Sequence, residues 1–168
     1  MAATMLHLDK EDPTARALAS AIQTGDGPTL TELLAQHPDL ATAGIDHRDR
    51  CGVQSRSLLH IATDWPGHYP NGPAVVATLV RAGADVNAKF VGSHAETPLH
   101  WAASSNDVAV LDALIDAGAN IEAAGGVIGG GSPLADARGF GQWDAARRLV
   151  ARGARTTLTD AAASRYAA

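Results

Sequence analysis

The chain has a single cysteine and no apolar run long enough to cross a membrane. Cys51 alone can form neither an internal disulfide nor a Cys-x-x-Cys zinc site, which indicates a reducing compartment. The longest apolar run, Ala74–Val80, is too short to span a bilayer. Acidic residues occupy the N-terminal region where a signal peptide needs an apolar segment. We therefore predict a cytoplasmic protein with no membrane partner.

The chain also has no excess of positive charge and few aromatic side chains. It carries 13 Lys and Arg against 18 Asp and Glu, a net charge of −5, which argues against a nucleic-acid partner. Aromatic residues make up only 4% of the 168 residues, whereas 46% are apolar. The core must therefore form by close stacking of alanine and aliphatic side chains, which suits an array of packed helices.

The most informative stretch is Thr97–Ala123, which predicts two short helices joined by a turn. Thr97 suits a helix N-cap, and Pro98 lies in a first turn where no backbone N–H is needed. The second helix, over Val108–Asp116, ends at Gly118, because a glycine readily takes the positive φ that follows a helix. The stretch therefore predicts a helix–turn–helix unit.

Glycines that end a helix recur at a fixed spacing: Gly83, Gly118 and Gly153 lie 35 positions apart. With its Thr-Pro-Leu-His start and two short helices, the unit at Thr97 resembles an ankyrin repeat, whose period is about 33 residues. The resemblance implies an all-α fold, an ankyrin-repeat solenoid of stacked helix pairs with elongated hairpin-like fingers. It also implies a binding module that engages a protein partner through its concave face and fingers.

The repeat register predicts one ankyrin domain over residues 13–160, with an N-terminal extension (1–12) and a tail (161–168). Units are expected at about 13–40, 57–88, 97–123 and 132–155, followed by a C-terminal capping helix. The expected inner helices are 15–23, 57–64, 98–105 and 133–140, and the expected outer helices are 29–36, 73–81, 108–116 and 143–151. The connections between units are long, which favours recognition, since insertions in repeat proteins gather on one face.

The segment that departs most from the family pattern is Trp65–Pro73, between the helices of the second unit. Its prolines stiffen a loop that carries two aromatic side chains and a histidine, which is typical of a recognition element. The alternative is that the loop fills a gap at the base of that unit. The resemblance to ankyrin repeats implies further binding residues at the variable inner-helix positions of each unit, which ankyrin domains use for contacts. The predicted binding residues are Asp64, Trp65, His68, Tyr69, Trp101, Ser104, Ser105, Asp136 and Phe140.

Two histidines occupy matching repeat positions, His60 and His100, and such a pair invites a metal interpretation. The resemblance instead implies a structural role, a hydrogen bond to the backbone of the neighbouring repeat, and a buried histidine normally has such partners. His60 and Asp64 share a helix face, but Pro66 breaks the helix before His68. Because a zinc site needs three or four convergent ligands, no metal is expected.

An enzyme is the rival hypothesis. Asp64, His68 and His94 would perform cofactor-independent acid–base chemistry, of the isomerase or lyase type. Trp65, Tyr69 and Trp101 would hold the small-molecule substrate. No nucleophile elbow or cofactor fingerprint accompanies them, so a protein partner is preferred and no cofactor is expected. A closed apolar cavity would favour the small-molecule hypothesis, and an open groove a protein partner.

The last third of the chain has three further features. Asp136 is a candidate partner for Arg138, whose charge must be paired if it is buried. The glycine-rich run at 125–132 lacks a Walker lysine and a βαβ context, so it predicts a finger that bends closely rather than a nucleotide site. Six arginines fall in the last 31 residues. We interpret them as solvent-exposed surface residues in preference to a binding site for an acidic partner.

Overall fold

The computed structural model describes residues 6–50 and 52–157, in which helices dominate the regular structure. Eight α-helices occur in the described residues as four consecutive pairs. Each of the four predicted inner helices and four predicted outer helices is confirmed, and its ends differ from the prediction by two residues or fewer. The helices are α1 (Pro13–Thr24), α2 (Gly27–Gln36), α3 (Leu58–Thr63), α4 (Gly72–Arg81), α5 (Pro98–Ser104), α6 (Val108–Asp116), α7 (Pro133–Gly139) and α8 (Trp143–Ala151).

Local sequence signals set the ends of these helices. The Asp12 carboxylate accepts a hydrogen bond from the Thr14 backbone N–H at 2.7 Å and thereby caps α1. Asp107 caps α6 in the same way, with the Val110 backbone N–H as donor at 3.2 Å. Gly118 follows α6 with a φ of 96°, as predicted.

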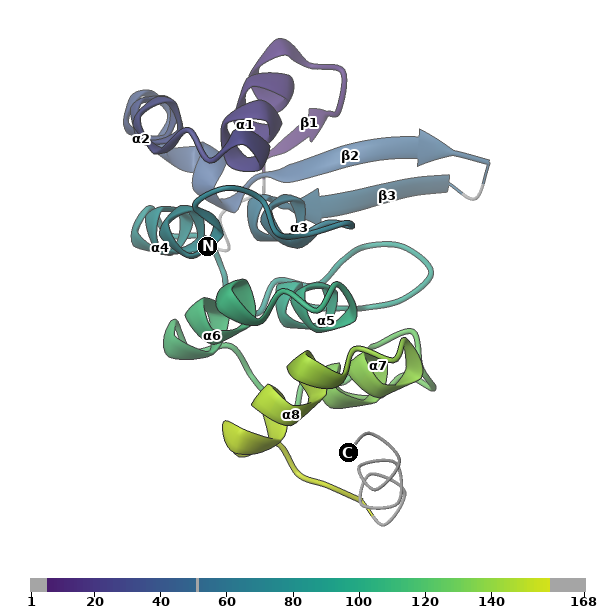
Figure 1. The fold of residues 1–168 in the computed structure, drawn as a ribbon. Helices are drawn as coiled ribbons and strands as arrows, with labels where there is room; N and C mark the ends of the chain where they lie inside the picture. The colour runs from purple at the N-terminus through teal and green to yellow at the C-terminus, as the bar shows by residue number, and fades with distance from the viewer. Residues whose placement is uncertain (1–5, 51, 158–168) are drawn as a thin grey trace, which may run out of the picture.

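The helices pack in two layers (Figure 1). The first helix of each pair packs on the first helix of the next, so α1, α3, α5 and α7 form one layer, here called the inner helices. The second helices, α2, α4, α6 and α8, pack in the same order and form the other layer. A continuous core of leucine and alanine side chains lies between the layers; Leu58, Leu99 and Leu111 are completely buried there.

A three-stranded sheet corrects the all-α prediction. Strand β1 (His7–Asp9) pairs in parallel with β2 (Gly44–Asp49), which pairs antiparallel with β3 (Gly52–Ser57). The segment that forms β2 and β3 is mostly polar, with Ile45 and Val53 as its main apolar side chains. The alternation that signals a strand is therefore too weak to read in the sequence.

The β2–β3 hairpin is the first of the connections that project beyond the inner helices (Figure 1). Paired hydrogen bonds of 2.9 and 3.0 Å join Ser55 to Val91, which lies in the next connection. The Ala95 backbone N–H donates to the carbonyl of Gly125 in the third connection at 3.1 Å. Successive fingers are thus fixed to one another by backbone hydrogen bonds.

The described residues end at position 157. The predicted C-terminal capping helix, which would follow residue 155, therefore lies outside them except for its first two residues. Between α2 and β2 the chain forms a short 3-10 helix, η1 (Pro38–Thr42), which begins at a proline. Within the described part of the chain, no helix combines the length and the apolar character that crossing a bilayer requires.

Candidate functional site

An open depression of about 210 Å³ lies where the second, third and fourth helix pairs meet at the base of the fingers. Six of the nine predicted binding residues line it. Three lie at or just after the ends of α3 and α7, and three lie on α5 or directly after it: Asp64, Trp65 and Phe140, and Trp101, Ser104 and Ser105. Its lining comprises Thr63, Asp64, Trp65, Glu96, Trp101, Ser104, Ser105, Val127 and Phe140.

Equivalent positions of successive helix pairs bring these side chains together. Asp64 ends α3, Ser105 ends α5 and Phe140 ends α7, and each is the C-cap of its helix. Because the inner helices pack side by side, their C-terminal ends meet on one face. Side chains that lie far apart in the sequence therefore share one surface.

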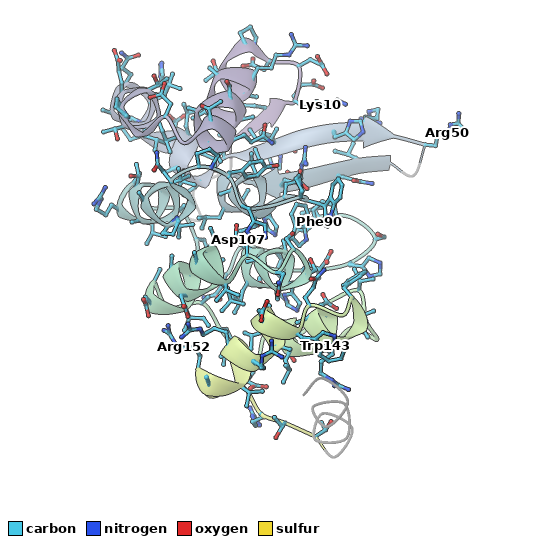
Figure 2. All side chains as sticks on the ribbon, in the orientation of Figure 1. Lys10, Arg50, Phe90, Asp107, Trp143 and Arg152 are labelled. Atoms are coloured by element: carbon cyan, nitrogen blue, oxygen red, sulfur yellow. The ribbon has the colours of Figure 1, made fainter. Side chains whose placement is uncertain are left out.

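The aromatic lining of the depression is unusually exposed. The Trp65 side chain is 81% exposed and Phe140 is 48% exposed. Trp101 is half-buried, because its ring packs edge-on against His60, with centroids 4.9 Å apart, and against Phe90 at 5.4 Å. Figure 2 labels Phe90 between the hairpin and α5. Trp101 is thus held in place by packing, whereas Trp65 extends into solvent.

Two carboxylates stand beside these rings. Asp64 accepts a hydrogen bond from the Arg56 guanidinium at 2.6 Å, and burial raises the pKa of its carboxyl although Arg56 opposes the shift. Glu96 is only 8% exposed, and burial raises the pKa of its carboxyl as well. A hydrogen bond from the Trp101 side chain acts against that rise. The depression is therefore aromatic and acidic.

Comparison with known proteins identifies the architecture. A family model described as ankyrin repeats, in three copies, matches residues 70–160. The chain belongs to the ankyrin-repeat family. Palmitoyltransferase AKR1 of Kluyveromyces lactis is 33% identical over 111 residues, which are 66% of this chain. The chain spans 13% of the length of that relative, so the match concerns one part of it.

The two ankyrin histidines are structural, as predicted. The backbone N–H of Ser57 donates to Nδ1 of His60 at 3.3 Å, so Nε2 carries the proton and donates to the Glu96 carbonyl at 3.0 Å. His100 repeats the arrangement, with the Thr97 N–H as donor at 3.1 Å and the Gly131 carbonyl as acceptor at 3.1 Å. Both imidazoles are completely buried, and each joins its ankyrin repeat to the following finger.

The Pro66–Pro70 insertion is attached to both neighbouring repeats. The His68 backbone N–H donates to the Asp107 carboxylate at 2.7 Å, and the His68 ring lies 3.1 Å from the Ser105 carbonyl. On the other side, Tyr69 accepts a hydrogen bond from Gln23 at 3.4 Å. His68 and Tyr69 do not line the depression. These contacts favour the gap-filling interpretation for this part of the loop, whereas Trp65 remains exposed.

Asp136 is not a surface residue, which corrects its place in the predicted binding set. Its side chain is completely buried. Its carboxylate accepts hydrogen bonds from the backbone N–H groups of Val127 at 3.3 Å and Ile128 at 2.8 Å. Asp136 thereby fixes the glycine-rich finger against α7. Nothing in the sequence indicated this burial. The N–H groups that bind the Asp136 carboxylate belong to residues 9 and 8 positions earlier, in the finger that covers it.

The residues proposed for acid–base chemistry do not form a common centre. Asp64 pairs with Arg56, the His68 ring faces the Ser105 carbonyl, and His94 is exposed on the second finger. Among the described residues, no hydrogen bond or ion pair joins any two of these three side chains. The same part of the chain holds no cluster of three or more His, Cys, Asp or Glu placed to bind a metal ion.

Sequence reasoning missed Glu96 and Arg56. Glu96 directly precedes the Thr97 that starts a repeat, and Arg56 lies on β3, which the sequence did not predict. Arg56 and Asp64 also line a neighbouring depression of about 350 Å³ against α1, so the two depressions adjoin at Asp64. Two of the late arginines pair instead on the outer helices: Arg152 lies 2.9 Å from Asp112, and Arg148 lies 3.4 Å from it. Arg148 of α8 and Arg152, the residue that directly follows α8, therefore link this helix to α6.

Proposed function

We propose that the chain is a protein-binding module whose partner docks on the depression lined by Trp65, Trp101 and Phe140. The observation that carries the proposal is that three successive inner helices end in side chains that meet on one open, aromatic surface. Ankyrin repeats support a role as an interaction module, and aromatic side chains are enriched in the energetically important part of protein interfaces.

The size of the depression favours a protein over a small molecule. Pockets for small molecules are usually about 300–1,000 Å³ and enclose most of the ligand. The depression is smaller than that and open, and Trp65 beside it is 81% exposed. A lone exposed tryptophan of this kind is well suited to insert into a partner.

The surroundings of the depression support a larger, rigid surface. The adjoining depression against α1 shares Asp64 with it, which extends the surface across the first helix pair. Backbone hydrogen bonds join the fingers, so little ordering would be needed when a partner binds. We propose that the helix pairs form a solenoid over residues 13–160, with this surface on its concave face, and that the protein acts in the cytoplasm.

Affinity capture with matched variants tests the proposal. Wild-type protein, the double variant Trp65→Ala/Phe140→Ala, and Trp143→Ala are immobilised at equal density and exposed to the same extract. Trp143 is a fair control because it is 38% exposed and does not line the depression. We expect proteins retained by the wild type and by Trp143→Ala to be lost with the double variant. Equal retention by all three would refute the proposed surface.

A further inference from the structure

We propose that the partner inserts a positively charged side chain, from lysine or arginine, into the depression between Trp65, Trp101 and Glu96. This inference rests on the proposed function and names the chemistry that the surface selects. Aromatic faces attract a cation held within about 6 Å, with arginine the more frequent partner. A carboxylate beside them adds an ion pair.

The charge of the lining is one-sided. The two acidic side chains that line the depression are Asp64 and Glu96, and no lysine or arginine is among its lining residues. Asp64 is already paired with Arg56. Glu96 makes no ion pair within the described part of the chain, although the residue is only 8% exposed. Among residues 6–50 and 52–157, the Glu96 carboxylate therefore has no salt-bridge partner.

A partner that covers this carboxylate must compensate for the water that it removes from Glu96. An apolar side chain placed over the depression would remove water from Glu96 and offer nothing in return, which is costly for a charge. A cation would replace the lost hydration with a direct attraction, and that attraction is stronger away from bulk water. The raised pKa of Glu96 shows that its surroundings already disfavour the charged form.

The aromatic side chains suit the same ligand. Trp101 is fixed by His60 and Phe90 and places its ring at the depression. Trp65 and Phe140 are exposed and line it as well. The remaining polar lining, Ser104 and Ser105, carries no charge that would repel a cation. Rings and carboxylate together favour a guanidinium or ammonium group over a neutral side chain of similar size.

Nuclear magnetic resonance can follow each of the three tryptophans separately. The probes are capped heptapeptides, Gly-Ser-Leu-X-Leu-Ser-Gly, in which X is arginine, lysine, the neutral arginine isostere citrulline, or glutamate. Indole N–H signals are assigned with single Trp→Phe variants. We expect the arginine and lysine peptides to shift the signals of Trp65 and Trp101 and to leave that of Trp143 in place.

Two variants make the result specific. Glu96→Gln keeps an oxygen for the Trp101 hydrogen bond and removes the charge. It should therefore weaken binding of the arginine peptide about fivefold, through the lost ion pair, and leave binding of the citrulline peptide unchanged. Phe140→Ala, at an exposed position, should weaken binding of the arginine and lysine peptides without disturbing the fold. If Glu96→Gln does not fold, the comparison of arginine with citrulline in the wild type decides the question.

Several results would overturn the inference: equal shifts with citrulline and arginine, tighter binding of the glutamate peptide, or no shift with any peptide. The proposed function has a separate test. A captured partner that is lost with Trp65→Ala/Phe140→Ala but binds Glu96→Gln with unchanged affinity would leave the protein-binding surface intact and refute the recognition of a cation. If the partner binds both Trp65→Ala/Phe140→Ala and Glu96→Gln as tightly as the wild type, both the proposed surface and the recognition of a cation are refuted.

Discussion

Replacing His60 by alanine should destabilise the protein far more than replacing His68. The His60 imidazole is completely buried and joins the Ser57 N–H to the Glu96 carbonyl. Alanine leaves the Ser57 N–H without that partner, at a cost of about 1–3 kcal/mol, whereas the Glu96 carbonyl keeps the Phe90 N–H as a donor at 2.8 Å. The free energy of unfolding should therefore fall by about 1–3 kcal/mol, and the cavity left by the completely buried ring adds to this loss. The exposed His68 ring makes one hydrogen bond, to Ser105, so His68→Ala should cost less than about 1.5 kcal/mol.

The His60 contribution should also depend on pH. Burial lowers the pKa of His60 from 6.5 to about 4. The unfolded chain therefore binds a proton below pH 6.5 that the folded chain does not, so this contribution is present above pH 6.5 and is lost as the pH falls toward 4. At about 1.4 kcal/mol per pH unit, the loss amounts to about 3 kcal/mol.

Urea denaturation at several pH values between 7.5 and 4 measures both effects. We expect the difference in unfolding free energy between wild type and His60→Ala to be largest at pH 7.5 and to shrink as the pH falls. Burial also lowers the pKa of His100, but His100 is present in both proteins and largely cancels in the difference. A difference that does not change with pH, or equal stability of His60→Ala and His68→Ala, would refute this reasoning.

Three further changes test the packing. Leu114→Ala should lower the free energy of unfolding by about 2–5 kcal/mol, measured by urea denaturation, because the side chain is completely buried; an unchanged midpoint would show that the site is not core. Asp136→Ala should speed amide hydrogen exchange at Val127 and Ile128, whose N–H groups lose their acceptor; unchanged exchange would contradict the anchoring role. Deleting Pro66–Pro70 should lower the melting temperature, because the segment binds both neighbouring repeats; a melting temperature equal to that of Trp65→Ala would show that the segment is dispensable.

The helices were predictable from sequence because their signals are local. Thr97, Pro98 and Gly118 mark the ends of one helix pair, and glycines at the same spacing mark others. The strands were not predictable, because β2 and β3 are polar and gain their stability from pairing with each other and, for β2, with β1. Such pairing joins residues as far apart as His7 and Gly44, which no local pattern records.

The candidate site was predictable in part for the same reason. Asp64, Ser105 and Phe140 each end an inner helix, so the repeat register brings them together. Glu96 could not be found this way, because its role depends on where the second finger folds back toward α5. Asp136 was misplaced because its acceptor role depends on a glycine-rich finger that the sequence does not position.

Photo-crosslinking tests the location of the binding surface most directly. p-Benzoylphenylalanine at position 140 replaces one exposed aromatic side chain by another, and the same group at position 150 reports on the outer helix α8, where Val150 is 43% exposed. Both proteins are irradiated in the presence of a captured partner. The proposed surface predicts a covalent complex from position 140 and none from position 150. A complex from position 150 alone would show that the partner binds elsewhere.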